Sequence, residues 1–172
     1  KTPIMEVIPH TVVTKKIYSE TMQNLNLCAV IERHKATGNV GVCYVKGFNL
    51  IGGAIAQTVG HDAHNITVIG DNSRDMALAV NALGKQGGMA LVTNGKVECV
   101  FPLPIAGLMS DKTAEETLIL HNELIAKTSI LNINQEIEPF MLLSFLSLIV
   151  IPDIKITDIG LFDVTKFEFI KD

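Results

Sequence analysis

The sequence lacks the short motifs that identify several common enzyme classes. Its 172 residues contain no Gly-x-x-x-x-Gly-Lys-Ser/Thr phosphate loop, no Gly-x-Ser-x-Gly nucleophile turn and no Cys-x-x-Cys pair. A nucleoside triphosphatase, a Rossmann dehydrogenase and an α/β-hydrolase are therefore disfavoured. We also find no internal repeat, low-complexity tract or heptad pattern, so neither a solenoid nor a coiled coil is expected.

Positive charge and long apolar runs are also scarce. Lys and Arg number 14 against 18 Asp and Glu, which leaves a net charge of −4, and the basic residues are scattered. Because a nucleic-acid surface requires clustered basic residues, we expect no nucleic-acid partner. The longest apolar run, Phe140 to Ile151, contains two serines and is shorter than the ~20 residues that cross a bilayer. It predicts a buried core element, and we expect no membrane partner.

Cysteine is too sparse for a disulfide framework. Cys28, Cys43 and Cys99 are odd in number and widely spaced, which predicts reduced core residues of a cytoplasmic protein instead of a zinc site. The chain starts at Lys1 without an initiator methionine, and no signal peptide follows. We therefore expect the chain to be a piece of a longer protein.

Hydrophobic residues are plentiful. They make up 48% of the sequence against 19% charged residues, and the mean hydropathy is +0.34. A single domain of this length buries roughly 70% of the surface that its unfolded chain exposes. The composition is more apolar than that of a typical independent domain, so part of the surplus is expected to face another polypeptide.

Local patterns predict an α+β fold (or a mixed-sheet α/β fold) of layered strands and helices with at least two β-hairpins. The expected hairpins join 27–34 to 40–48 and flank the Asn94-Gly95 turn. One helix is expected from Asn72 or Ser73 to Gly87-Gly88, and another from Thr113 to Ile130, entered through Ser110 or Asp111. Pro139 fits the first position of a third helix. Residues 66–71 and the tail predict strands, 52–59 fits strand or helix, and 3–17 fits an edge strand or an entry linker.

One stretch, "TVGHDAHNITVIG", places four polar side chains between apolar segments. His61, Asp62, His64 and Asn65 could hold a ligand or relay protons, since imidazole titrates near neutral pH and a carboxylate fixes its tautomer. Alternatively, Asp62 and Asn65 could satisfy a buried turn. Two histidines and one aspartate leave a metal's ligand set incomplete, so His61 and His64 are weak candidates as metal ligands.

Four motifs in order resemble the C-terminal domain of bacterial and archaeal adenine deaminase, a member of the amidohydrolase superfamily. They are "ERHKATGNVGVCYVKGF", "GFNLIGGAIAQTVGHDAHNITVIG", "LPIAGLMSD" and "PFMLLSFLSLIVIPDIKITDIGLFDV". The resemblance extends from about Ile31 to Val164. It implies a domain at 27–172, with 1–26 as the segment that leads in from a preceding domain.

The resemblance also implies an activity and its cofactor. The family hydrolyses adenine to hypoxanthine and ammonia in purine salvage, using manganese or iron held by a (β/α)₈ barrel that precedes this domain. The barrel's His-x-His motif is absent here, so no catalytic residue is assignable, no metal is expected in this chain, and the chain alone is expected to be inactive. The implied partners are adenine and the barrel domain of the same chain. His61, Asp62, His64 and Asn65 would then lie at or near the substrate.

Two other interpretations remain open at this stage. The chain could be a docking or homo-oligomerisation module in which the polar motif only satisfies a turn. It could also be a stand-alone small metal- or purine-binding protein that shares the domain.

Overall fold

A computed structural model describes residues 1–170. Within that range a mixed eight-stranded sheet has the order β2-β1-β4-β3-β6-β5-β7-β8, and a three-stranded sheet has the order β11-β10-β9. The large sheet comprises β1 (Thr2–Val7), β2 (Thr14–Ser19), β3 (Asn26–Ile31), β4 (Val40–Lys46), β5 (Gly53–Gln57), β6 (Ile66–Gly70), β7 (Gly88–Thr93) and β8 (Lys96–Pro102). The small sheet comprises β9 (Ile154–Thr157), β10 (Gly160–Asp163) and β11 (Glu168–Phe169). The α+β prediction is confirmed.

Both predicted hairpins are present. β3 pairs antiparallel with β4, so that Cys28 faces Cys43 across the ladder, and β7 pairs with β8 around Asn94-Gly95. Both turn residues have positive φ, as a type I′ turn requires. Residues 52–59, for which the sequence allowed strand or helix, contain β5. The alternation of side chains along these strands is what separates the two faces of the sheet.

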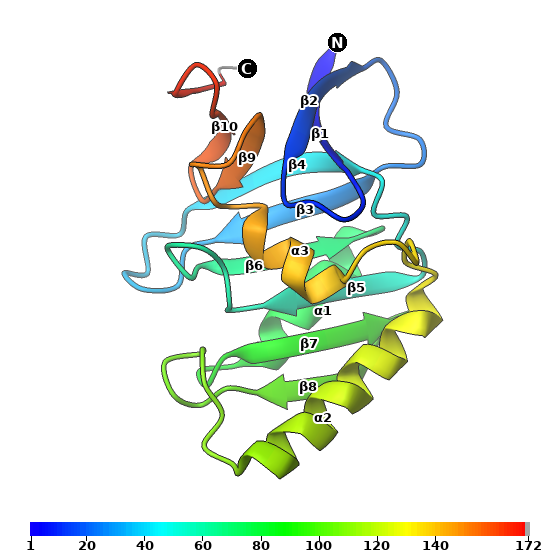
Figure 1. Cartoon of the computed structure of the whole chain (residues 1–172), viewed down its shortest axis with the longest axis vertical. Coiled ribbons are helices and arrows are strands. Elements are labelled where there is room, and N and C mark those ends of the chain that lie inside the picture. Colours follow the sequence, from blue (N-terminus) through cyan, green and yellow to red (C-terminus); the bar gives the residue numbers. More distant parts are fainter. Residues whose placement is uncertain (171–172) are drawn as a thin grey trace.

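The helices lie on opposite faces of the large sheet. Figure 1 shows α1 (Ser73–Leu83) behind the sheet, and α2 (Ala114–Lys127) and α3 (Pro139–Phe145) in front of it. The rear face packs its small apolar residues on α1. The front face carries the larger core, built with α2, α3 and the small sheet. Within residues 1–170 no helix is long and apolar enough to span a bilayer.

The predicted end of the first helix and the predicted entry residue of the second were wrong. The first helix ends at Leu83, capped by the backbone N–H of Gly84, before the predicted Gly87-Gly88 stop. The second helix starts at Thr113 as predicted, but Thr113 itself is the entry residue, because its side chain forms a capping box with Glu116. That reciprocal pair satisfies two orphan amides at once, an advantage that neither predicted entry residue, Ser110 or Asp111, offers. After Lys127 the chain continues as a 3₁₀ turn, Thr128–Leu131. Pro139 does occupy the first turn of α3.

Residues 1–26 contribute β1 and β2 to the large sheet. β2 is an edge strand, and β1 joins the sheet through a parallel pairing with β4. The hairpin also contacts the small sheet, because Lys16 on β2 pairs with the buried Asp163 on β10. Of the two alternatives for residues 3–17, the strand is the one observed, with β2 at the edge of the sheet and β1 inside it. The proposed division of the chain at residue 27 stays a prediction.

Candidate functional site

The polar motif forms the loop from β5 to β6, and α3 anchors one side of it. The His61 amide donates to the Ser144 carbonyl at 2.8 Å, and the Ser147 hydroxyl donates to the His61 carbonyl at 2.8 Å. Within the loop, the His64 amide donates to the Gly60 carbonyl at 2.7 Å. These bonds satisfy the loop's own backbone groups, so its conformation is set by main-chain contacts.

The loop's other side is held by residues that follow β3. Arg33 Nε donates to the His64 carbonyl at 2.6 Å, and His34 Nε2 lies 2.7 Å from the Ala63 carbonyl. A second guanidinium nitrogen of Arg33 donates to the Ala106 carbonyl at 2.8 Å. One arginine thus joins two loops that are more than 40 residues apart in the chain.

Sequence reasoning missed these supports. Arg33, His34 and Ser147 lie within motifs of the resemblance, but they bond to main-chain carbonyls of a loop distant in sequence. Such bonds leave no local spacing signal. Only the tertiary structure brings these donors to the motif.

The two imidazoles of the motif help to order the loop. The His61 ring lies against Phe145, with centroids 4.7 Å apart, and 6.0 Å from the His64 ring. His64 Nδ1 accepts the Gly60 amide proton at 3.3 Å. Burial lowers the pKa of His64, and the nearby His61 and Arg33 lower it further. His64 is therefore held as a neutral imidazole near pH 7, because protonation would lose the Gly60 bond.

The residues present do not fit a bound metal. Among residues 1–170 no group of three or more His, Cys, Asp or Glu side chains is placed to hold a metal ion. His64 also has one ring nitrogen occupied by the Gly60 amide, and tetrahedral metal sites require at least three protein ligands. We assign no chemistry through a metal to this loop.

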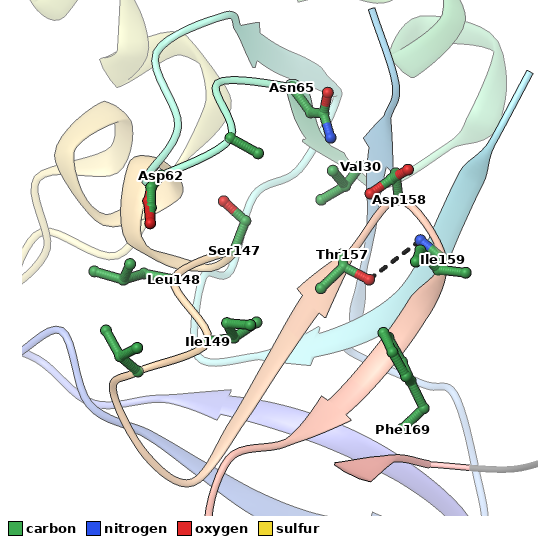
Figure 2. Close-up of a pocket in the computed structure, with 12 residues that line it drawn as sticks. Val30, Asp62, Asn65, Ser147, Leu148, Ile149, Thr157, Asp158, Ile159 and Phe169 are labelled. Carbon is green, nitrogen blue, oxygen red and sulfur yellow. Dashed lines mark hydrogen bonds between the residues drawn. The ribbon is translucent and has the colours of Figure 1, made fainter. Parts of the chain in front are cut away.

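A cavity of about 430 Å³ lies beside the loop (Figure 2). Asp62, Ala63 and Asn65 line it, whereas His61 and His64 do not. The opposite wall comes from the segment after α3 and from the β9–β10 turn, including Thr157 and Asp158. The four predicted site residues are therefore close in space but divided in role. Asp62 and Asn65 line the cavity, whereas His61 packs on Phe145 of α3 and His64 bonds within the loop.

Comparison with known proteins decides the family. The model of the adenine deaminase C-terminal domain matches residues 5–168. This chain belongs to the adenine deaminase C-terminal domain family. The resemblance predicted from four motifs is confirmed.

Relatives of this domain carry the same name. Adenine deaminase of Nitratidesulfovibrio vulgaris is 46% identical over 94% of this chain, which covers 30% of that protein. Adenine deaminase of Bacillus subtilis is 45% identical over 92% of the chain, which covers 28% of that protein. For adenine deaminase 2 of Desulfotalea psychrophila the identity is 49%, over 86% of the chain and 26% of the relative. The chain thus spans less than a third of the length of these relatives.

Proposed function

We propose that this chain acts as the C-terminal domain of an adenine deaminase, which hydrolyses adenine to hypoxanthine and ammonia in purine salvage. The observation that carries the proposal is the 46% identity to a named adenine deaminase over 94% of the chain. The chemistry is assigned to a preceding barrel that holds manganese or iron. The three cysteines, all free, support a reducing compartment, the cytoplasm.

In this proposal the 58–65 loop faces the barrel mouth. Asp62 and Asn65 present polar atoms to the cavity, while His61 and His64 hold the loop in place. Positioning of this kind matters, since a displacement of about 1 Å can cost roughly 100-fold in rate. The domain would thus contribute to substrate placement without supplying the metal.

The direct test is a deamination assay with manganese. We expect the full-length protein to convert adenine to hypoxanthine with release of ammonia, and this chain alone to show no turnover. Turnover by the chain alone would contradict the assignment of the chemistry to the barrel. Failure of the metal-loaded full-length protein to act on adenine would contradict the proposed activity itself.

A second experiment tests the role of the loop. In the full-length enzyme, His61→Ala and His64→Ala should each lower kcat/KM roughly tenfold or more, because the loop loses a packing contact or the Gly60 hydrogen bond. His10→Ala is the matched control, since His10 is exposed and lies outside the loop. Unchanged kcat/KM in both loop variants would show that the motif only satisfies a turn.

A docking role is the second candidate function. Met109, Leu118 and Ile119 expose 58%, 59% and 66% of their surfaces on the 103–112 loop and α2. Met109 and Leu118 also line one shallow cavity, and exposed apolar patches mark interaction surfaces, which supports contact with the barrel or with a second copy as a homo-oligomer. Met109→Ser together with Leu118→Ser should weaken such an assembly, as measured by light scattering of the full-length protein.

A further inference from the structure

The cavity beside the 58–65 loop has the size and composition of a small-molecule site. Its volume of about 430 Å³ falls within the roughly 300–1,000 Å³ typical of ligand pockets, which combine apolar walls with a few polar groups. The apolar wall consists of Val30, Leu148, Ile149, Val150, Ile159 and Phe169. The polar groups come from the loop, from Ser147 after α3 and from the β9–β10 turn, as Figure 2 shows.

Asn65 is the residue in this cavity that most requires a partner. Only 8% of its surface is exposed, and its Oδ1 is buried without a hydrogen-bond partner among residues 1–170. Figure 2 shows the amide nitrogen directed toward Val30 and Asp158, with no hydrogen bond to any residue drawn. A buried amide oxygen without a partner is destabilising, because it has lost its hydrogen bonds to water. Oδ1 is itself fully buried, so the group that can meet a ligand is the amide nitrogen, which donates to none of the residues drawn.

The charge of the lining limits which ligands the cavity can accept. Two carboxylates line it, Asp62 and Asp158, and none of its described lining residues is Lys, Arg or His. Asp158 Oδ2 accepts a bond from Asn39 at 3.1 Å, which leaves Oδ1 for another donor. Such a lining repels phosphate and favours a neutral base with an amino group.

An aromatic side chain also lines the cavity. Phe169 lines the cavity and exposes 44% of its surface, so one part of its ring is available to a flat ligand. Stacking between a base and an aromatic ring is favourable for any base, because every base has a π-face.

We propose that this cavity binds the free base adenine, with the Asn65 amide donating to a ring nitrogen, Asp158 or Asp62 accepting from the exocyclic amine, and Phe169 stacking on the ring. The ligand class is an aminopurine that carries its amino group beside a ring acceptor. The inference rests on the proposed adenine deaminase function for the choice of base. It assigns to this chain a base-binding site that contains no metal.

Binding to the chain itself tests the inference without any turnover. The 172-residue chain is titrated with adenine to about 1 mM and followed by calorimetry and by amide NMR. We expect signals of Asn65, Asp158 and Phe169 to shift, with hypoxanthine binding more weakly, because its exocyclic carbonyl oxygen presents an acceptor to the two carboxylates where adenine presents an amino donor. Adenosine monophosphate should also bind more weakly, since the lining offers no cation to its phosphate.

Two pairs of variants provide matched comparisons. Phe167 and Phe169 both pack edge-on against Phe162, at 5.2 and 5.1 Å, but only Phe169 lines the cavity. Phe169→Ala should weaken adenine binding at least about fivefold, and Phe167→Ala should leave it unchanged. Asn65→Leu should weaken binding roughly tenfold, with Asn122→Leu on the exposed face of α2 as its control. Thermal unfolding of each variant verifies that it is folded.

Three outcomes would overturn the inference. They are no adenine binding by the chain or by the full-length protein at this cavity, equal effects of Phe167→Ala and Phe169→Ala, or equal affinity for hypoxanthine. Hydrogen exchange on the full-length protein could give a fourth such outcome. If the amides of residues 147–159 are protected equally with and without adenine, polypeptide fills the cavity. If the chain binds adenine but the full-length enzyme does not deaminate it, the proposed function fails and this site remains. If the full-length enzyme deaminates adenine but this cavity does not bind it, the proposed function stands and the proposed site fails.

Discussion

At the scale of single residues, the most unusual environment outside the site is that of Lys155. It lies on β9 with none of its surface exposed, and its ammonium group donates to the Val12 carbonyl at 2.8 Å. Burial lowers the pKa of Lys155 to about 8. The charged form is therefore destabilised by its removal from water.

This burial predicts an unusual dependence of stability on pH. Because the pKa of Lys155 is lowered from 10.5 to about 8 on folding, its unfavourable contribution is fully present below about pH 8. The contribution disappears as pH rises toward 10.5. We expect Lys155→Met to raise the free energy of unfolding at pH 7 by about 1 kcal/mol or more, after loss of the Val12 bond.

Urea unfolding at pH 7 and pH 9.5 measures the effect. The gain from Lys155→Met should shrink at the higher pH, whereas Lys15→Met, at an exposed position of β2, should change little at either. A destabilised Lys155→Met variant at pH 7 would show that the Val12 bond outweighs the desolvation cost.

The location of the four candidate site residues could be predicted from the sequence, but their orientation could not. The clustering of His61, Asp62, His64 and Asn65 in a loop between two apolar segments was readable directly from their spacing. Their division into two residues that face a cavity and two that pack inward was not, because alternation rules do not apply to an irregular loop. The geometry depends on Ser144 and Arg33, which come from other elements.

At the scale of secondary-structure elements, turn and cap chemistry decides where each element begins and ends. The Asn94-Gly95 hairpin follows from the two positive φ values that its turn requires. The start of α2 depends on a reciprocal pair, since Thr113 Oγ1 accepts from the Glu116 amide at 3.3 Å and the Thr113 amide donates to the Glu116 carboxylate at 3.1 Å. Ser110 makes only a local bond to the Lys112 amide, at 3.1 Å.

The capping box makes a prediction that separates the observed N-cap, Thr113, from the expected entry residues, Ser110 and Asp111. Thr113→Ala should lower the free energy of unfolding by about 1 kcal/mol, the usual cost of a lost N-cap. Ser110→Ala should cost less than half as much, because Ser110 lies outside the helix. Thermal unfolding of the two variants measures the difference. A larger loss of stability for Ser110→Ala than for Thr113→Ala would show that Ser110 is the residue that caps the helix.

At the scale of the whole molecule, the two sheets pack through a close backbone contact. A methyl group added at Gly41 on β4 would lie 1.9 Å from the Thr157 carbonyl oxygen and 2.9 Å from the Gly160 amide nitrogen. Both partners are backbone atoms at the β9–β10 turn, which also borders the cavity. The absence of a side chain at residue 41 is therefore a condition for this sheet arrangement.

Replacing this glycine should disturb the fold and the cavity together. Gly41→Ala is expected to lower the free energy of unfolding by at least about 2 kcal/mol, since the backbone must move to relieve the clash. Val42→Ala is the neighbouring control, because Val42 exposes 51% of its surface and should change stability little. Urea unfolding provides the measurement. Equal stability of Gly41→Ala and the parent would show that the sheets can separate without cost.

The amino-acid sequence by itself determined the fold class, both hairpins, the existence of the three helices and the location of the polar loop. These features depend on periodicity and turn chemistry within short windows. The tertiary structure alone decided the order of the sheet strands, the place of residues 1–26 within the large sheet and the cavity shared by Asn65 and Asp158. Those features require contacts between residues distant in the chain, such as Met5 with Val45 within the large sheet and Lys16 with Asp163 between the two sheets. Such contacts are selected by the packing of the whole core, and they leave no periodic pattern in the chain.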